Sequence, residues 1–166
     1  MLFRSQIRQS AELVDEVIRE ALKHTGQSRT GRTIKVEEED ELILAKMDAR
    51  LIVQVLINLI GNAVKYTPQG TDITVRVRKE KAENGENSQV IISVCDLGDG
   101  IPDDRKERVF DMFYTGGDQV ADSRRSLGLG LGLCRSIINA HGGKIWISDN
   151  IPHGAVVTFK IGRAHV

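Results

Sequence analysis

The chain has 166 residues, with 23 Lys and Arg balanced by 23 Asp and Glu. This is the length of one domain, so a single domain is predicted over residues 1–166. A net charge of zero gives no electrostatic reason to expect a nucleic-acid partner. Because only 4% of the residues are aromatic, a core of Val, Ile and Leu is expected.

Cysteines and apolar runs bear on the cellular compartment. Cys95 and Cys134 both lie in apolar stretches and form no CxxC pair, so buried, reduced thiols of a cytosolic domain are predicted. The apolar run Leu51–Ile60 is interrupted by Gln54 and Asn58, which makes it too short and too polar to cross a bilayer. The fragment is therefore not expected to be embedded in a membrane, although it is compatible with a place in a longer membrane protein.

In chain order, the first element predicted is a helix over 11–24, with Ser10 as its N-cap. Strands at 33–36 and 42–47 follow, around an acidic turn at 37–41. Asp48 is expected to cap a central helix over 49–66, which Pro68 and Gly70 end.

The second half alternates strands, loops and one helix. Strands are predicted at 73–78 and 90–95, separated by a polar loop over 79–88. Apolar periodicity fails from 97 to about 127, and a loop this long is commonly functional. A helix over 129–141 and strands at 144–148 and 155–161 complete the pattern. The tail 162–166 shows no pattern and is left out of the predicted fold.

This mixture predicts an α+β fold with antiparallel hairpins at both ends of the chain. The architecture expected is a two-layer α/β sandwich, in which one mixed sheet carries helices on one face.

A polar stripe interrupts the central helix. Asn58, Asn62 and Lys65 are spaced by four and three residues, so they share one face, and Tyr66 follows them. Asparagines in an apolar helix need partners. Either they bond to neighbouring groups, or Asn62 gives a carbonyl oxygen to Mg²⁺ and Lys65 a positive charge to phosphate.

A second cluster, residues 96–102, has the sequence Asp-Leu-Gly-Asp-Gly-Ile-Pro at the end of a predicted buried strand. It is either an ordinary turn with an aspartate cap or a base-binding turn. In the second case Asp96 accepts a hydrogen bond from an exocyclic amine such as that of adenine, while Gly98 and Gly100 let the backbone approach the base.

Three alternate glycines, Gly128, Gly130 and Gly132, lead into a predicted helix. Backbone N–H groups and the helix dipole make such a helix start an anion site. A dinucleotide-binding loop would need glycine at Leu133 and a preceding strand, and no Walker A lysine is present.

Between these clusters lie Phe110 and Phe113, which either anchor a flexible lid or belong to the core. Arg124 and Arg125 precede the glycines and are either phosphate ligands or a solvated charge pair.

In this order the clusters resemble the N, G1, F and G2 boxes of the histidine-kinase branch of the GHKL ATPases. The matching segments are 58–66, 96–101, 109–113 and 128–133, and the resemblance covers residues 33–161. The N and G2 boxes, with His141-Gly-Gly-Lys, are similar to those of KdpD-type potassium-responsive sensor kinases.

The resemblance implies a Bergerat ATP-binding fold, ATP and Mg²⁺ as ligands, and a lid over 103–127. It implies that Asn62 holds the metal and that the catalytic set is Asn58, Lys65, Arg124 and Arg125. The nucleotide-binding residues that it implies are Asn58, Asn62, Lys65, Tyr66, Asp96, Gly98, Gly100, Ile101, Phe110, Phe113, Gly128, Leu129, Gly130, Leu131, Gly132 and Leu133.

The resemblance further implies transfer of the γ-phosphoryl group of ATP to a histidine, in a two-component system of a membrane-anchored bacterial sensor. Hydrolytic relatives begin the N box with a glutamate that activates water, whereas Asn58 cannot take a proton, so slow hydrolysis is expected. Leu97, Thr115 and Gly61 depart from the family pattern at positions that bear on catalytic efficiency.

The phosphoacceptor text follows none of the four histidines. The acceptor is therefore expected in a separate dimerisation domain of the same protein, with a response regulator downstream. Two alternatives remain open at this point: a non-catalytic nucleotide-binding or partner-docking module, and a serine kinase of the anti-sigma-factor type on the same fold.

Overall fold

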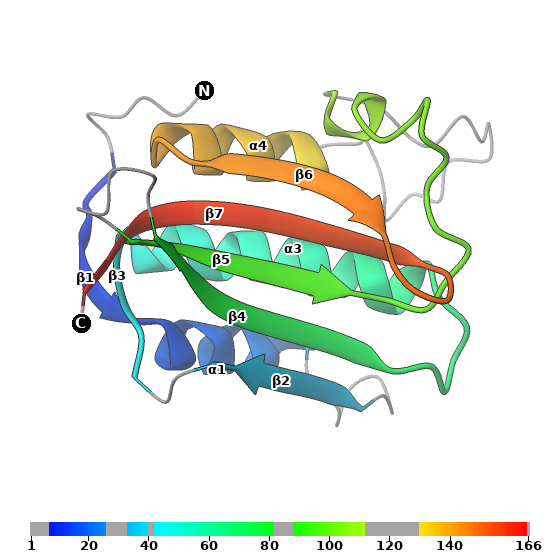
Figure 1. Ribbon diagram of the computed structural model, residues 1–166, viewed down its shortest axis with the longest axis horizontal. Coiled ribbons are helices and arrows are strands. Elements are labelled where there is room, and N and C mark those ends of the chain that lie inside the picture. Colours follow the sequence, from blue (N-terminus) through cyan, green and yellow to red (C-terminus); the bar gives the residue numbers. More distant parts are fainter. Residues whose placement is uncertain (1–6, 26–32, 40–41, 82–87, 112–129, 166) are drawn as a thin grey trace.

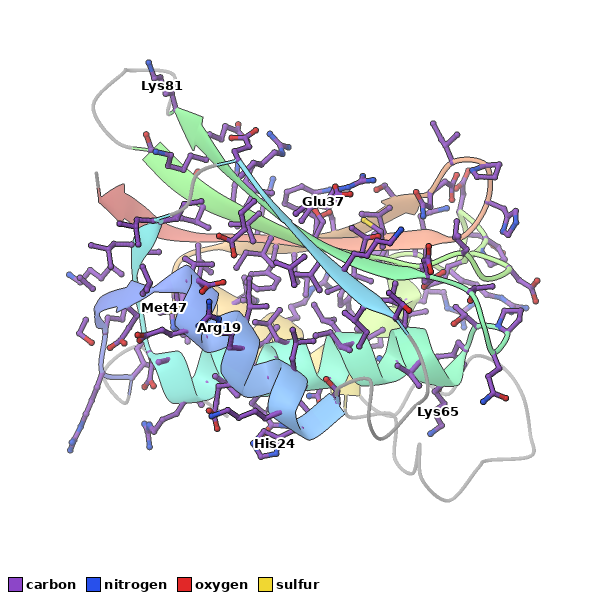
Figure 2. All side chains as sticks on the ribbon, turned by 90° about the horizontal axis from the view of Figure 1, so that it is seen from below. Arg19, His24, Glu37, Met47, Lys65 and Lys81 are labelled. Atoms are coloured by element: carbon purple, nitrogen blue, oxygen red, sulfur yellow. The ribbon has the colours of Figure 1, made fainter. Side chains whose placement is uncertain are left out.

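The computed structural model describes residues 7–25, 33–39, 42–81, 88–111 and 130–165, the side chains of the last segment as far as 162. Within these ranges the chain forms two layers, a sheet and a layer of helices that covers one of its faces (Figures 1 and 2). The strands are β1 Ser10–Leu13, β2 Ile34–Glu38, β3 Leu44–Met47, β4 Ile73–Lys81, β5 Ser88–Cys95, β6 Lys144–Asp149 and β7 Ala155–His165. The helices are α1 Val14–Thr25, α3 Ala49–Lys65 and α4 Gly130–Ala140, and η2 Arg108–Phe110 is a short 3-10 helix.

The strand order is β1-β3-β7-β5-β4-β2, with β6 also paired to β7. All pairs are antiparallel except β2 with β4. This architecture confirms the predicted α+β sandwich, a mostly antiparallel sheet with helices on one face.

Helix α3 lies at the centre of the helical layer, beneath β5 and between α1 and α4 (Figure 1). Its apolar residues recur at helical spacing and are almost completely buried, which explains why the sequence pattern located this helix to within one residue. These residues are Ile52, Val55, Leu56, Leu59, Ile60 and Ala63.

The predicted start of the first helix is wrong. Residues 10–13 form β1, in register with β3 from Ser10 opposite Met47 to Leu13 opposite Leu44. Ser10 does not cap a helix; its hydroxyl lies 2.6 Å from the carboxylate of Glu12. Pairing with a distant strand has overridden the local helical spacing, a form of tertiary override that sequence periodicity does not reveal.

The hairpin expected at the N-terminal end is also absent, whereas the C-terminal hairpin β6–β7 is confirmed. Strands β2 and β3 form close to where they were predicted, but β2 pairs parallel with β4, and β3 pairs with β1 and β7. Glu37 and Glu38, assigned to a turn, belong to β2.

The tail also departs from the prediction, because β7 continues to His165 and pairs with β3 opposite Leu44 and Ala45. Gly162 has a φ of +64°, and a Cβ there would lie 2.6 Å from the backbone oxygen of Lys46, so this close approach requires glycine. Within the described ranges, no helix has the length and apolar character needed to span a bilayer.

Candidate nucleotide site

The end of α3 packs directly against the glycine turn that follows β5. A Cβ added at Gly98 would lie 2.7 Å from the Thr67 methyl group and 3.2 Å from the backbone oxygen of Tyr66. Thr67 is held in place because its hydroxyl donates to the Ala63 oxygen at 2.6 Å. The first and second sequence clusters therefore meet at one end of the molecule, where only glycine fits.

Asp96 lies at this junction with one carboxylate oxygen already bound. Oδ1 accepts hydrogen bonds from the backbone N–H groups of Gly98 at 2.9 Å and Ala155 at 3.1 Å. Among the described residues, no hydrogen bond reaches Oδ2. The carboxylate is therefore fixed in orientation and keeps one oxygen able to accept a hydrogen bond from a ligand.

The turn between β6 and β7 forms hydrogen bonds to the backbone at Asp96 and Gly98. The side-chain amide of Asn150 donates to the Asp96 backbone oxygen at 2.7 Å. Nδ1 of His153 lies 2.9 Å from the Gly98 oxygen, so that ring nitrogen carries the proton. A Cβ at Gly154, whose φ is +113°, would lie 2.1 Å from the Asp96 oxygen. Sequence reasoning missed these three residues, because the segment carries only the signals of an ordinary turn.

The start of α4 lies beside the middle of α3. The amide nitrogen of Asn58 is 3.8 Å from the Cys134 sulfur, and the Asn58 oxygen accepts from Gln54 at 3.3 Å. Asn58 thus has protein partners, as in the first of the two interpretations given above. The prediction that Cys134 is a buried thiol is confirmed: it is fully buried, and burial raises the pKa of its thiol to about 12.

The 3-10 turn η2 packs on the other side of α4. The Phe110 ring is only 3% exposed and lies 4.4 Å beneath the guanidinium of Arg135. Arg135 also forms an ion pair with Glu107 at 2.5 Å. Phe110 is therefore a core residue with very little surface for a nucleotide, and the alternative in which this ring belongs to the core is the one observed.

The other expected ligands are distributed as follows. Asn62 is half-buried on α3, one turn before its end, and its side chain makes no hydrogen bond within the described part of the chain. Lys65 and Tyr66 are exposed at the end of α3, with Lys65 on the side away from the sheet (Figure 2). Ile101 is half-buried, and its backbone oxygen accepts from the ammonium of Lys106 at 2.8 Å.

At the start of α4, Leu133 is exposed and Gly132 buried, while Gly130 and Leu131 are half-buried. Five of the expected residues lie outside the described ranges: Phe113, Arg124, Arg125, Gly128 and Leu129. So does the greater part of the predicted lid.

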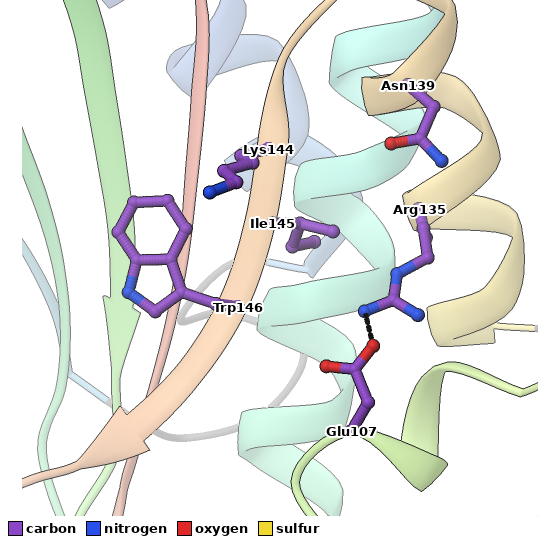
Figure 3. A pocket seen from close by; sticks show the side chains of 6 residues that line it. All are labelled: Glu107, Arg135, Asn139, Lys144, Ile145 and Trp146. Atoms are coloured by element: carbon purple, nitrogen blue, oxygen red, sulfur yellow. Dashed lines mark hydrogen bonds and ion pairs between the residues drawn. The ribbon is translucent and has the colours of Figure 1, made fainter.

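A hollow of about 380 Å³ lies between η2, α4 and β6 (Figure 3). Its lining residues are Glu107, Arg135, Asn139, Lys144, Ile145 and Trp146. None of the expected nucleotide-binding residues contributes to it, so it is separate from the Asp96 site.

Polar groups at the opposite end of α3 are bound to one another. The backbone N–H of Asp48 donates to Nε2 of the buried His141 at 3.0 Å, and Nδ1 of His141 lies 2.7 Å from the Ile137 oxygen. The Asp48 carboxylate accepts from the backbone N–H of Arg8 at 3.0 Å and from Arg50 at 3.2 Å. Burial opposes the charge, but these bonds outweigh it and hold the pKa of Asp48 below its ordinary value.

The residues present fit a purine nucleotide with its magnesium ion. Gly98 lets the turn after Asp96 pack against the end of α3, and Asp96 Oδ2 faces no protein donor among the described residues. No group of three or more His, Cys, Asp or Glu side chains in the described ranges would hold a metal alone. A hard cation here would therefore take its oxygens from Asn62 and from the ligand.

Residues 47–165 match the family of histidine kinase-, DNA gyrase B-, and HSP90-like ATPases. The chain is 39% identical over 159 residues to the sensor protein KdpD of Clostridium acetobutylicum, covering 96% of this chain and 17% of that protein. The nucleotide-free catalytic domain of histidine kinase ThkA superimposes with a TM-score of 0.78 at 30% identity, covering 95% of this chain and 97% of that one. ThkA in complex with the response regulator TrrA gives a TM-score of 0.74 at 30% identity, covering 93% and 42%.

The family match covers most of the chain, and the ThkA catalytic domain matches it over almost its whole length. The chain therefore belongs to the histidine kinase-, DNA gyrase B-, and HSP90-like ATPases, and it has the fold of a histidine kinase catalytic domain.

Proposed function

We propose that the chain binds ATP through Asp96 and presents its γ-phosphoryl group to a histidine on another domain of the parent protein. The observation that carries this proposal is the geometry of the Asp96 carboxylate. Two backbone N–H groups hold Oδ1, which leaves Oδ2 to accept from the 6-amino group of adenine. Guanine presents a carbonyl oxygen at that position, which would repel the carboxylate.

Phosphate binding falls to the end of α3 and the start of α4. Mg²⁺, when bound, would neutralise phosphate charge, with the Asn62 amide oxygen as its protein ligand. Lys65 and Tyr66 would contact the nucleotide, and the N–H groups of 128–133 would meet the phosphates at the α4 N-terminus. Gly100 and Ile101 continue the base-binding turn, and 103–127 would form the lid, with Arg124 and Arg125 toward the γ-phosphate.

Hydrolysis of ATP should be slow in this site. Asn58 bears an amide, which does not accept a proton at neutral pH. The Cys134 thiol that it contacts is equally unsuitable, because burial raises its pKa to about 12. The protein therefore contributes position and charge to phosphoryl transfer, and the incoming histidine supplies the nucleophile.

The chain spans 17% of the length of its KdpD relative. We propose that a dimerisation domain elsewhere in the parent carries the phosphoacceptor histidine, and that a response regulator receives the phosphoryl group. Histidine kinase ThkA, which has been crystallised with the response regulator TrrA, supports the second proposal. We also propose that the parent protein is anchored in a membrane.

Phosphotransfer in trans tests this function. The 166-residue chain is incubated with labelled ATP, Mg²⁺ and the separately produced acceptor domain of the parent, with Asp96→Asn and an acceptor lacking the histidine as controls. Acid-labile, alkali-stable label should appear on the acceptor only, and only with wild-type chain and intact histidine. ATP binding without transfer to the acceptor would instead show a non-catalytic nucleotide-binding module.

A further inference from the structure

The peptide of Asp96 is held by a residue that lies 54 positions later in the chain. Nδ2 of Asn150 donates to the Asp96 backbone oxygen at 2.7 Å. Asp96 N–H also donates to the Ala155 oxygen at 2.9 Å. The peptide groups on both sides of the Asp96 Cα are thus tied to the segment 150–155, which forms the turn between β6 and β7.

Asn150 is itself fixed in one orientation. Its Oδ1 accepts from the Ile151 N–H at 2.9 Å, and its own N–H donates to the Gly154 oxygen at 2.9 Å. A backbone N–H only donates and a backbone oxygen only accepts, so the two amide ends of Asn150 cannot be exchanged. One side chain therefore joins the closure of the turn to the position of Asp96.

Close packing makes this support stiff. A Cβ at Gly154 would lie 2.1 Å from the Asp96 oxygen, and one at Gly100 would lie 3.1 Å from the Gly154 oxygen. At Gly154 the backbone of the turn therefore contacts the backbone of Asp96 directly, and a shift of the turn would move Asp96.

We propose that Asn150 is a positioning residue, which fixes the Asp96 peptide so that carboxylate Oδ2 meets the 6-amino group of a bound purine. Asn150 does not touch the nucleotide. It sets the preference of the site for a purine that bears this amine, and in this respect the inference rests on the function proposed above.

Calorimetric titration of the 166-residue chain tests the proposal with two Mg²⁺-bound ligands: ATP, and purine riboside triphosphate, which lacks the 6-amino group. The variants are Asn150→Ala, Asn150→Asp and Asp96→Asn, alone and combined. Asn150→Asp keeps the acceptor for Ile151 N–H and removes the donor to Asp96. Asn139→Ala is the matched control, because Asn139 is an exposed asparagine of α4 whose side chain makes no hydrogen bond within the described residues.

Asn150→Ala and Asn150→Asp should each reduce the preference for ATP over the purine analogue by about five- to tenfold, the effect of one lost hydrogen bond. In the Asp96→Asn background the same changes should alter the ATP affinity by less than about twofold, because the amine contact is already gone. Asn139→Ala should change nothing.

Equal weakening of both ligands, or an undiminished effect in the Asp96→Asn background, would mean general damage and would overturn the inference. If Asn150→Ala does not fold, the ligand preference of Asn150→Asp decides. A wild type that prefers ATP through Asp96, with unaltered preference in both Asn150 variants, removes this inference alone. Absence of ATP binding by the wild type removes the proposed function as well.

Discussion

A carboxylate lies beside each end of helix α3, and the two carboxylates serve different purposes. At its start, the Asp48 N–H donates to His141 and the Asp48 carboxylate accepts from Arg8 and Arg50, so that a closed polar network joins α3 to α4. At its end, Asp96 has one oxygen bound and one without a protein donor in the described ranges. A fully paired buried network indicates structure, whereas a carboxylate that is fixed and half satisfied indicates a ligand.

The largest effects should come from a glycine at each end. A Cβ added at Gly154 would lie 2.1 Å from the backbone oxygen of Asp96. One added at Gly143 would lie 2.0 Å from the backbone oxygen of Lys160. Gly154→Ala and Gly143→Ala should each lower the free energy of unfolding by about 2–4 kcal/mol, since each forces backbone to move. Urea unfolding and ATP titration of the folded fraction separate the two ends: only Gly154→Ala should weaken ATP binding. An equal loss of ATP affinity in both variants would contradict a separate role for the Gly154 end in nucleotide binding.

His141→Ala should lower the stability of the fold without affecting ATP binding. The change leaves the buried Asp48 N–H without the acceptor Nε2, at a cost of about 1–3 kcal/mol. ATP affinity should stay within about twofold of wild type. His24→Ala, an exposed substitution on α1, is the control and should change stability by less than about 0.5 kcal/mol. A large loss of ATP affinity in His141→Ala would show that the two ends are coupled.

The smallest expected effect is the loss of folding stability at acidic pH. The pKa of folded Asp48 lies below its ordinary value, because its hydrogen bonds to Arg8 and Arg50 outweigh burial. Its ionised form therefore stabilises the fold above the ordinary aspartate pKa, and this contribution disappears as the pH falls through the lower pKa of the folded state. The difference in unfolding free energy between wild type and Asp48→Asn should shrink as the pH is lowered below about 4. A difference that grows in acid would reverse the assignment.

The sequence predicted best those features that depend on neighbouring residues. The α3 pattern is local, and so is the glycine turn after Asp96; both were found. Strand β1 and the parallel pair β2–β4 depend on contacts with residues about 30–40 positions away, which periodicity does not record. For the same reason β7 was ended too early, since its last residues pair with β3.

The site follows the same rule. The turn of Asp96 and Gly98 and the position of Asn62 on α3 follow from local sequence, whereas the burial of Phe110 beneath Arg135 does not. An aromatic residue after a glycine turn gives the same sequence signal in a lid and in a core. Asn150 was not predicted, because a turn asparagine gives no sign of which distant peptide its side chain reaches.

ATP titration and urea unfolding of Asp96→Asn and Asp48→Asn test most directly whether the two carboxylates, one beside each end of α3, serve different purposes. Asp96→Asn keeps an oxygen for the Gly98 and Ala155 N–H groups and turns the other into a donor. It should weaken Mg²⁺-ATP by about ten- to a hundredfold with little change in stability, the effect of one charge-assisted hydrogen bond. Asp48→Asn should lower stability by about 1–3 kcal/mol and leave affinity within about twofold. The reverse pattern, or the same pattern in both variants, would contradict the account.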